Sequence, residues 1–313
     1  MLQCAAMACQ PIERVRPITN MLVKILSIVF PIFAIVVVGY VYGLRHKPDM
    51  QAATKINMDL FVPALVLWAL ASKDFQLARY SQLALAASAV VLGSGVLAWP
   101  VARLLRVQVN TFVPPMMFNN SGNMGIPLIL LALGMQALPG AIILFLVEML
   151  LHFCLGLYML DHRARIAPIL RQPVMLASML GLVISFSGWP MPEPLTLSIK
   201  MLGDMSVPLM LFTLGVRMTH VSLDDWKIGV IGGLLCPLSG LAIAAVCLWV
   251  WPLPAEQRAM LWLFAALPPA VLNYLVAEQY GQEPARVASV VLLGNLLSLV
   301  VIPATLLFAL PGL

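Results

Sequence analysis

Charge is what this sequence lacks. Only 10% of its 313 residues are charged, whereas a typical soluble domain carries roughly 25%. The mean hydropathy is +0.98, and 62% of the residues are hydrophobic. A soluble protein of this length would have too few polar residues to cover its surface. The composition therefore excludes a soluble globular domain and indicates an integral membrane protein.

Catalytic and metal-binding motifs are also lacking. The five cysteines form no CxxC pair, and the chain contains no HExxH, GxSxG or GxxxxGK[ST] sequence. These absences argue against an intramembrane enzyme and against an ATP-driven pump, so we expect no catalytic residues, no metal and no cofactor. The net charge of +5 needs no nucleic-acid partner, because Lys and Arg in short loops set the orientation of a membrane protein.

Long apolar runs are abundant, and ten of them approach the ~20 residues that a helix needs to cross the hydrocarbon core. The predicted fold class is therefore an all-α integral membrane protein with ten transmembrane helices. The predicted spans are 21–43, 53–71, 81–102, 112–133, 138–160, 173–190, 195–216, 228–251, 260–280 and 287–310. Residues 1–20 fit no span and are expected to form a disordered N-terminal extension.

The distribution of basic residues predicts the orientation of these spans. If the N-terminus lies outside, eleven Lys and Arg fall on the cytoplasmic side and seven on the outer side. Cytoplasmic loops of membrane proteins carry such an excess of basic residues. We therefore expect both termini to lie outside the cytoplasm.

The chain repeats part of itself. The segment KINMDLFVPALVL (55–67) shares Lys, Asp, Val and Pro at identical spacing with KMLGDMSVPLMLF (200–212). Pro31 and Gly39 likewise match Pro173 and Gly181. The matches predict a first five-helix repeat at 21–160, a cytoplasmic linker at 161–172 and a second repeat at 173–313. Because five is odd, the second repeat would be inverted, as in many secondary transporters. Chance similarity between apolar segments is the alternative.

The fourth span has a polar centre, FNNSGNMGIPLIL (118–130). Prolines flank it, and the ninth span carries its own pair of prolines at the matching position. Proline removes a donor and pushes the preceding residue out of a helix, so we predict that both spans are broken. Free helix ends and carboxamides would suit a carboxylate. The predicted substrate-binding residues are Asn119, Asn120, Ser121, Asn123, Pro268, Pro269 and Asn273. A plain proline kink is the alternative.

Three acidic residues lie within predicted spans, where charge is costly and often functional. Asp59, Glu148 and Asp204 are the candidates for proton or ion coupling. Asp59 and Asp204 could instead be structural, because each can pair with a lysine four residues earlier. Glu148 could pair with His152 or stay protonated against a neighbouring helix. Its counterpart in the second repeat is Asn295, which suggests that both positions face the bundle interior.

With these motifs the chain resembles a bacterial member of the auxin efflux carrier family. The resemblance rests on PIFAIVVVGYVYGL (31–44), FNNSGNMGIPLI (118–129) and EQYGQEPARVASVVLLGNLLSLVVIPATL (278–306), and covers about residues 21–313. That family shares its architecture with plant PIN carriers and bile acid/sodium symporters. The resemblance implies that spans 4 and 9 cross at their breaks and that substrate binds beside the crossing.

The same resemblance implies a secondary transporter of small organic anions, such as malonate or malate, in the bacterial inner membrane with periplasmic termini. Proton coupling, sodium coupling and uniport stay open, as does a membrane receptor or scaffold that binds without transporting. The expected partners are the organic anion, membrane lipid and a second copy of the chain in a homodimer. The short linker 161–172 departs from the long central loop of the plant carriers, which argues against regulation by phosphorylation there.

Overall fold

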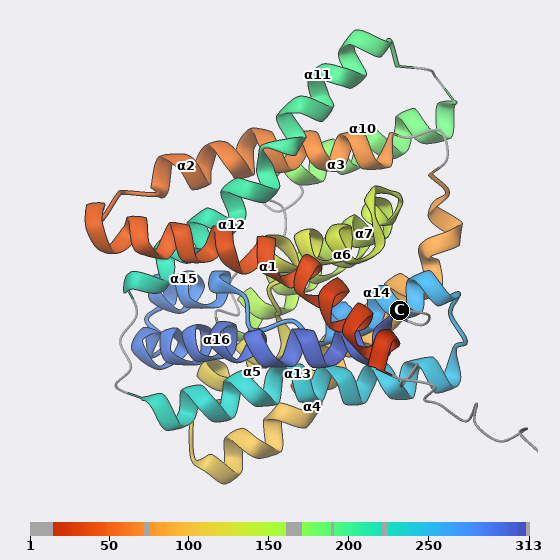
Figure 1. The fold of residues 1–313 in the computed structure, drawn as a ribbon. Coiled ribbons are helices and arrows are strands. Elements are labelled where there is room, and N and C mark those ends of the chain that lie inside the picture. The colour runs from red at the N-terminus through yellow and green to blue at the C-terminus, as the bar shows by residue number, and fades with distance from the viewer. Residues whose placement is uncertain (1–14, 72–74, 161–170, 189–190, 221–224, 311–313) are drawn as a thin grey trace, which may run out of the picture.

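The computed structural model describes residues 15–71, 75–160, 171–188, 191–220 and 225–310. These residues are helical, apart from the connecting loops and a single isolated β-bridge (Figure 1). Seven helices in this part of the chain are long and apolar enough to cross a membrane: Val23–His46, Gln51–Leu70, Leu77–Leu105, Met135–Leu160, Glu193–Arg217, Trp226–Val250 and Pro284–Ala309. The chain is thus an all-α membrane protein.

The other three predicted spans are shorter or interrupted. The fourth consists of α5 (Val109–Met117), a gap, the π-helical turn η3 (Ser121–Gly125) and α6 (Ile126–Leu133). The ninth consists of α14 (Ala255–Ala265), a gap and α15 (Val271–Tyr280). The sixth is α10 (Pro173–Ser187), of 15 residues. The predicted interruptions of the fourth and ninth spans are therefore present.

The N-terminal boundary differs from the expectation. Helix α1 runs from Val15 to His46, so residues 15–20, expected in a disordered extension, belong to a helix. Residues 1–14 of that extension lie outside the described residues, as do residues 161–170 of the expected linker. The remaining helices of the first half are α2 (Gln51–Ile56), η1 (Asn57–Phe61), α3 (Val62–Leu70), η2 (Leu77–Tyr80), α4 (Ser81–Leu105), η4 (Met135–Ala137), α7 (Leu138–Leu151), η5 (His152–Gly156) and α8 (Leu157–Leu160).

The second half completes two groups of helices. Its further elements are α11 (Glu193–Asp204), α12 (Ser206–Arg217), η6 (Met218–His220), α13 (Trp226–Val250) and α16 (Pro284–Ala309). One group contains α1–α3 and α10–α12, and the other contains α4, α5 and α13–α16, with α6 and α7 between them (Figure 1). We call the first group the scaffold and the second, with α6 and α7, the crossover domain.

Glycines allow the closest helix contacts of the scaffold. A Cβ atom at Gly215 of α12 would lie 2.0 Å from the Val36 carbonyl oxygen of α1. A Cβ atom at Gly39 of α1 would lie 2.2 Å from the Phe212 carbonyl oxygen of α12. The two helices therefore touch backbone to backbone, a packing mode that membrane helices favour because lipid supplies no hydrophobic drive for association.

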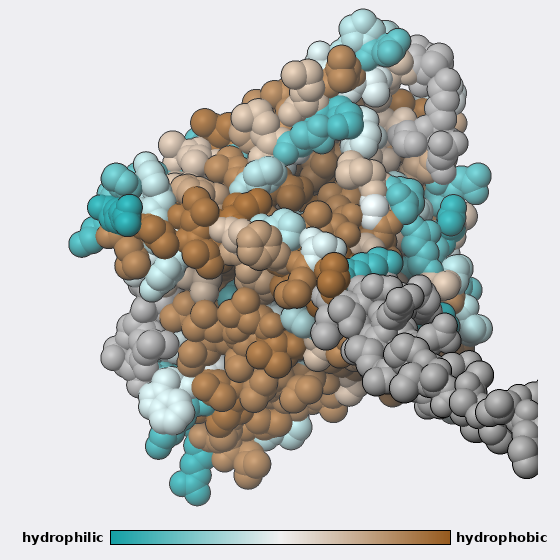
Figure 2. Space-filling view, viewed as in Figure 1, coloured by the Kyte–Doolittle hydropathy of each residue, from teal (hydrophilic) through white to brown (hydrophobic). Residues whose placement is uncertain are grey.

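The outer surface is apolar around the middle of the bundle. Figure 2 shows hydrophobic residues over most of one face, with hydrophilic residues gathered mainly toward its two ends and on α11. Large apolar side chains such as Phe30, Val96 and Trp249 are exposed on the surface of the protein. Such a belt fits lipid as the surrounding solvent.

Candidate functional site

The two broken helices meet at their breaks. Residue Asn119, in the first gap, forms an antiparallel bridge with Pro269, in the second. The Asn120 N–H donates to the Pro268 carbonyl at 2.7 Å, and the Ala270 N–H donates to the Phe118 carbonyl at 3.0 Å. Non-helical backbone inside a membrane must find partners in the protein. Here each break supplies the partners of the other, and we call residues 118–120 and 266–270 the crossover.

Carboxamide side chains satisfy the remaining carbonyls of the crossover. The Asn119 Nδ2 donates to the Phe264 carbonyl at 2.8 Å, at the end of α14. Asn273 Nδ2 donates to the Phe118 carbonyl at 2.8 Å. Both side chains are buried, and in both the Oδ1 atom has no hydrogen-bond partner among the residues that the structure describes. The structure therefore brings the predicted asparagines together. The side-chain N–H groups of Asn119 and Asn273 donate to backbone carbonyls, and their unpartnered atoms are acceptors.

Asn295 of α16 joins the same network. Its Nδ2 donates to the Pro269 carbonyl at 3.2 Å and to the Val291 carbonyl at 2.8 Å, while its Oδ1 accepts from Asn120 Nδ2 at 3.3 Å. Only 3% of Asn295 is exposed, so the expectation that it faces the bundle interior is confirmed. It was not among the predicted binding residues, although its repeat relation to Glu148 was the signal that could have placed it there.

A small cavity of about 90 Å³ lies beside the crossover, and we call it the inner cavity. The N-terminal turns of η3–α6 and of α15 both border it. The first N–H groups of a helix have no intrahelical partner and carry partial positive charge. The cavity therefore combines two electropositive helix ends. Its lining residues are Met58, Asn119, Asn120, Ser121, Gly122, Asn123, Phe145, Glu148, Met149, His152, Ala270, Val271 and Leu272.

Glu148 of α7 is the acidic residue of the inner cavity. Only 3% of it is exposed, and its Oε2 atom has no hydrogen-bond partner. The hydroxyl and the backbone N–H of Ser121 lie beside its carboxyl group. A buried carboxyl group is thus held against the N-terminal turn of η3, where negative charge is favoured.

His152 does not pair with Glu148. Its ring stacks on Phe118, with the ring centroids 4.2 Å apart and the planes at 5°. His152 also opens the π-helical turn η5, and Gly156 at the end of that turn makes room for Phe118, since a Cβ atom there would lie 2.8 Å from the Phe118 ring. His152 therefore supports the crossover by packing.

A larger cavity of about 440 Å³ also adjoins the crossover, and we call it the vestibule. Scaffold residues of the α1–α2 loop and of α12 line one wall, and α15 and α16 line the other. Val271 borders both cavities, so they adjoin at the start of α15. The lining residues are Lys47, Pro48, Asp49, Met50, Gln51, Leu214, Val216, Arg217, Met218, Val271, Tyr274, Leu275, Glu278, Ala288, Val291, Leu292 and Asn295.

The vestibule lies toward one end of the bundle. Helices α1, α12 and α15 end there, and α2 and α16 begin there (left in Figure 1). By the distribution of basic residues, this end is the one expected to face the cytoplasm. Charged residues in the vestibule were not among the predicted site residues, because nothing in the sequence brings α12 beside α15.

Two of the candidate coupling residues lie away from both cavities. Asp204 forms the predicted ion pair with Lys200, with Nζ and Oδ2 2.6 Å apart, on exposed α11. Asp59 is exposed on the π-helical turn η1, and no ion pair joins it to Lys55 in the described part of the chain. The neighbouring Asn57 is buried instead, with an unpartnered Oδ1. Of the three acidic candidates, Glu148 alone borders the crossover.

Two sequence comparisons relate the chain to known membrane transport proteins. Residues 163–306, which include the second break, Arg217 and Asn295, match the family described as "Membrane transport protein". The chain is also 31% identical over 147 residues to auxin efflux carrier component 6 of Arabidopsis thaliana. That match covers 44% of this chain and 25% of the plant protein, so the chain spans only part of this relative. Together with the paired breaks, these similarities support membership of the chain in the auxin efflux carrier family of membrane transport proteins.

Proposed function

We propose that this protein is a secondary transporter of small organic anions, carboxylates such as malonate or malate, and that it works by alternating access at the crossover. The observation that carries the proposal is the inner cavity, where the N-terminal turns of two half-helices meet beside a buried carboxyl group. Helix N-termini bind anions. Broken helices with such ends are the sites where secondary transporters bind substrate and coupling ions.

The proposed architecture is ten transmembrane segments in two inverted five-helix repeats. The three segments beyond the seven long helices are α5–α6, α10 and α14–α15. Repeat-matched glycines support the symmetry, because Gly39 of the first span packs against the seventh and Gly181 of the sixth packs against the second. A Cβ atom at Gly181 would lie 3.5 Å from the Leu67 carbonyl oxygen, the exchanged counterpart of the Gly39 contact with the Phe212 carbonyl oxygen. Crossing of the two breaks at Asn119 and Pro269 fits the same two-fold relation.

We propose that Glu148 couples the site to protons. When Glu148 is ionised, its own carboxylate occupies the positive end of η3, and like charge disfavours a substrate carboxylate in the same cavity. When it is protonated, the two helix ends are free for the anion. A proton and an anion would then bind together and cross together. Uniport is the outcome if Glu148 keeps one protonation state throughout.

Sodium coupling is the second candidate, and a specific observation favours it. Among the described residues, two of the unpartnered oxygens at the crossover, Asn119 Oδ1 and Glu148 Oε2, belong to residues that line the inner cavity. Hard cations take oxygen ligands of this kind. Replacing the proton gradient by an inward sodium gradient separates the two candidates directly.

The proposal is tested by uptake of labelled malonate and malate into proteoliposomes, with and without an inward proton gradient. Asn120→Ala removes the carboxamide that ties the first break to Asn295, so we expect uptake to fall at least tenfold while the protein stays folded. Asn110→Ala is the matched control, because Asn110 is exposed at the start of the same interrupted span. Wild-type protein that binds either acid without net flux would show a receptor instead of a carrier.

A further inference from the structure

Two basic residues line the vestibule, Lys47 and Arg217, and neither forms an ion pair within the described part of the chain. Arg217 is the last residue of α12 and is partly buried in the vestibule wall. Its Nη2 donates to Thr54 Oγ1 at 3.1 Å, and no ion pair joins it to a carboxylate of the described residues. Its place at a helix C-terminus favours a positive charge. A guanidinium carries five N–H donors, and one of them has Thr54 as its partner.

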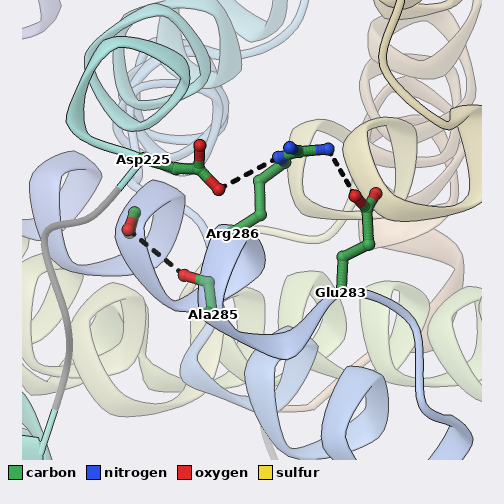
Figure 3. Close-up of polar contacts among 5 residues, drawn as sticks. Asp225, Glu283, Ala285 and Arg286 are labelled. Carbon is green, nitrogen blue, oxygen red and sulfur yellow. Dashed lines mark hydrogen bonds and ion pairs between the residues drawn. The ribbon is translucent and has the colours of Figure 1, made fainter.

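Arg286, at the same end of the bundle, forms ion pairs with carboxylates. Its Nε donates to Asp225 at 3.2 Å, and its Nη1 donates to Glu283, so two carboxylates neutralise it (Figure 3). That arrangement joins the start of α13 to the start of α16. Arg286 is thus paired with two carboxylates, whereas Arg217 borders a cavity and has a neutral hydroxyl as its hydrogen-bond partner.

The two carboxylates of the vestibule, Asp49 and Glu278, accept hydrogen bonds from residues other than Arg217. Asp49 Oδ1 accepts from the Gln51 N–H at 2.8 Å, and Glu278 Oε1 accepts from the Tyr274 hydroxyl at 3.2 Å. Lys47 is exposed at the end of α1. Neither carboxylate neutralises Arg217, although both line the same cavity. Arg217 therefore offers a planar, permanently charged set of donors to whatever enters the vestibule, and such donors pair best with carboxylate or phosphate groups.

We propose that Arg217 is the anion-binding residue of the vestibule, where its guanidinium, positioned by Thr54, binds a carboxylate of the substrate on its way between the cytoplasmic end and the crossover. This inference rests on the proposed function and adds a specificity-determining residue that belongs to the scaffold. The vestibule extends from this residue to Asn295, so an acid held by Arg217 is already in the cavity that reaches the crossover.

The same chemistry could be supplied by the phosphate of an anionic lipid headgroup. The test therefore measures the concentration dependence of malonate uptake in vesicles of phosphatidylcholine alone and in vesicles containing phosphatidylglycerol. The variants are Arg217→Gln, Arg217→Lys and Thr54→Val. Arg45→Gln is the matched control, because Arg45 lies exposed at the same end of the bundle but does not line the vestibule.

We expect Arg217→Gln to raise the half-saturating malonate concentration about tenfold or more, because a charge-assisted hydrogen bond is lost. Arg217→Lys should recover part of the loss, Thr54→Val should give a smaller rise, and Arg45→Gln should have no effect. The neutral analogue malonamide should compete poorly with malonate in wild type. If Arg217→Gln does not fold, the Lys and Val variants carry the same test.

Distinct outcomes separate the two proposals. Malonate uptake by wild type that Arg217→Gln leaves unchanged would overturn the role of Arg217 but not the transport function. Failure of wild type to bind or transport any carboxylate would overturn both. A half-saturating concentration that rises only with phosphatidylglycerol, and no longer does so in Arg217→Gln, would assign the guanidinium to a lipid headgroup and reject it as a substrate contact.

Discussion

At the scale of single residues, the site is built by carboxamides and one carboxyl group. Three asparagines donate their side-chain N–H groups to carbonyls that the two breaks leave without helical partners. They are Asn119, Asn273 and Asn295. A buried carbonyl without a donor costs free energy comparable to a lost hydrogen bond. The asparagines therefore stabilise the crossover first. In the proposed mechanism, the helix ends and Arg217 bind the anion.

Glu148→Gln tests the coupling role at this scale. Glutamine keeps the size of the side chain and its place beside Ser121, but it cannot bind or release a proton. We expect the variant to exchange malonate across the membrane while losing stimulation by an inward proton gradient. The measurement is exchange and gradient-driven uptake in the same vesicles. Retained stimulation would remove Glu148 from the coupling mechanism.

At the scale of elements, two features decide the arrangement. The interrupted helices pair through 118–120 and 266–270, and the long helices touch at glycines. Three π-helical turns, η1, η3 and η5, also interrupt the first half of the chain. Such turns occur often at functional sites, and here each contains a buried polar residue, namely Asn57, Ser121 and His152.

Gly215→Ala tests the backbone contact between α1 and α12. The added Cβ would lie 2.0 Å from the Val36 carbonyl oxygen and 2.8 Å from the Tyr40 nitrogen, so the helices must move apart. Overpacking of this kind costs about 1–3 kcal/mol. We expect a lower thermal midpoint in detergent, measured by intrinsic fluorescence. The control is Val38→Ala on the exposed face of α1, and equal midpoints for both variants would contradict the predicted clash.

At the scale of the whole molecule, the vestibule makes one end of the bundle the open end. The vestibule reaches from one end of the bundle to the crossover, between the scaffold and α15–α16. Under alternating access, relative motion of these two groups would close this opening and create one at the other end. The structure then corresponds to the state that is open to the expected cytoplasmic side.

Cysteine labelling tests this conformation and the orientation together. In a background without native cysteines, Leu275→Cys places a thiol in the vestibule wall, and Met135→Cys places one at the opposite end of the bundle. A membrane-impermeant maleimide should label Leu275→Cys only from the cytoplasmic side, and Met135→Cys only from the outer side. Substrate should slow labelling of Leu275→Cys. Labelling from the reversed sides would show that the predicted orientation is wrong.

Composition and local pattern in the sequence determined the membrane class and the interruptions at 118–120 and 266–270. These follow from short-range physics, because hydropathy sets where helices form and proline sets where they break. Tertiary structure alone decided what surrounds each break. It placed Glu148 and Asn295 at the crossover, left Asp59 exposed, and brought Arg217 of α12 into one cavity with α15. Such contacts join residues far apart in the chain, and they depend on how helices pack rather than on what any single segment encodes.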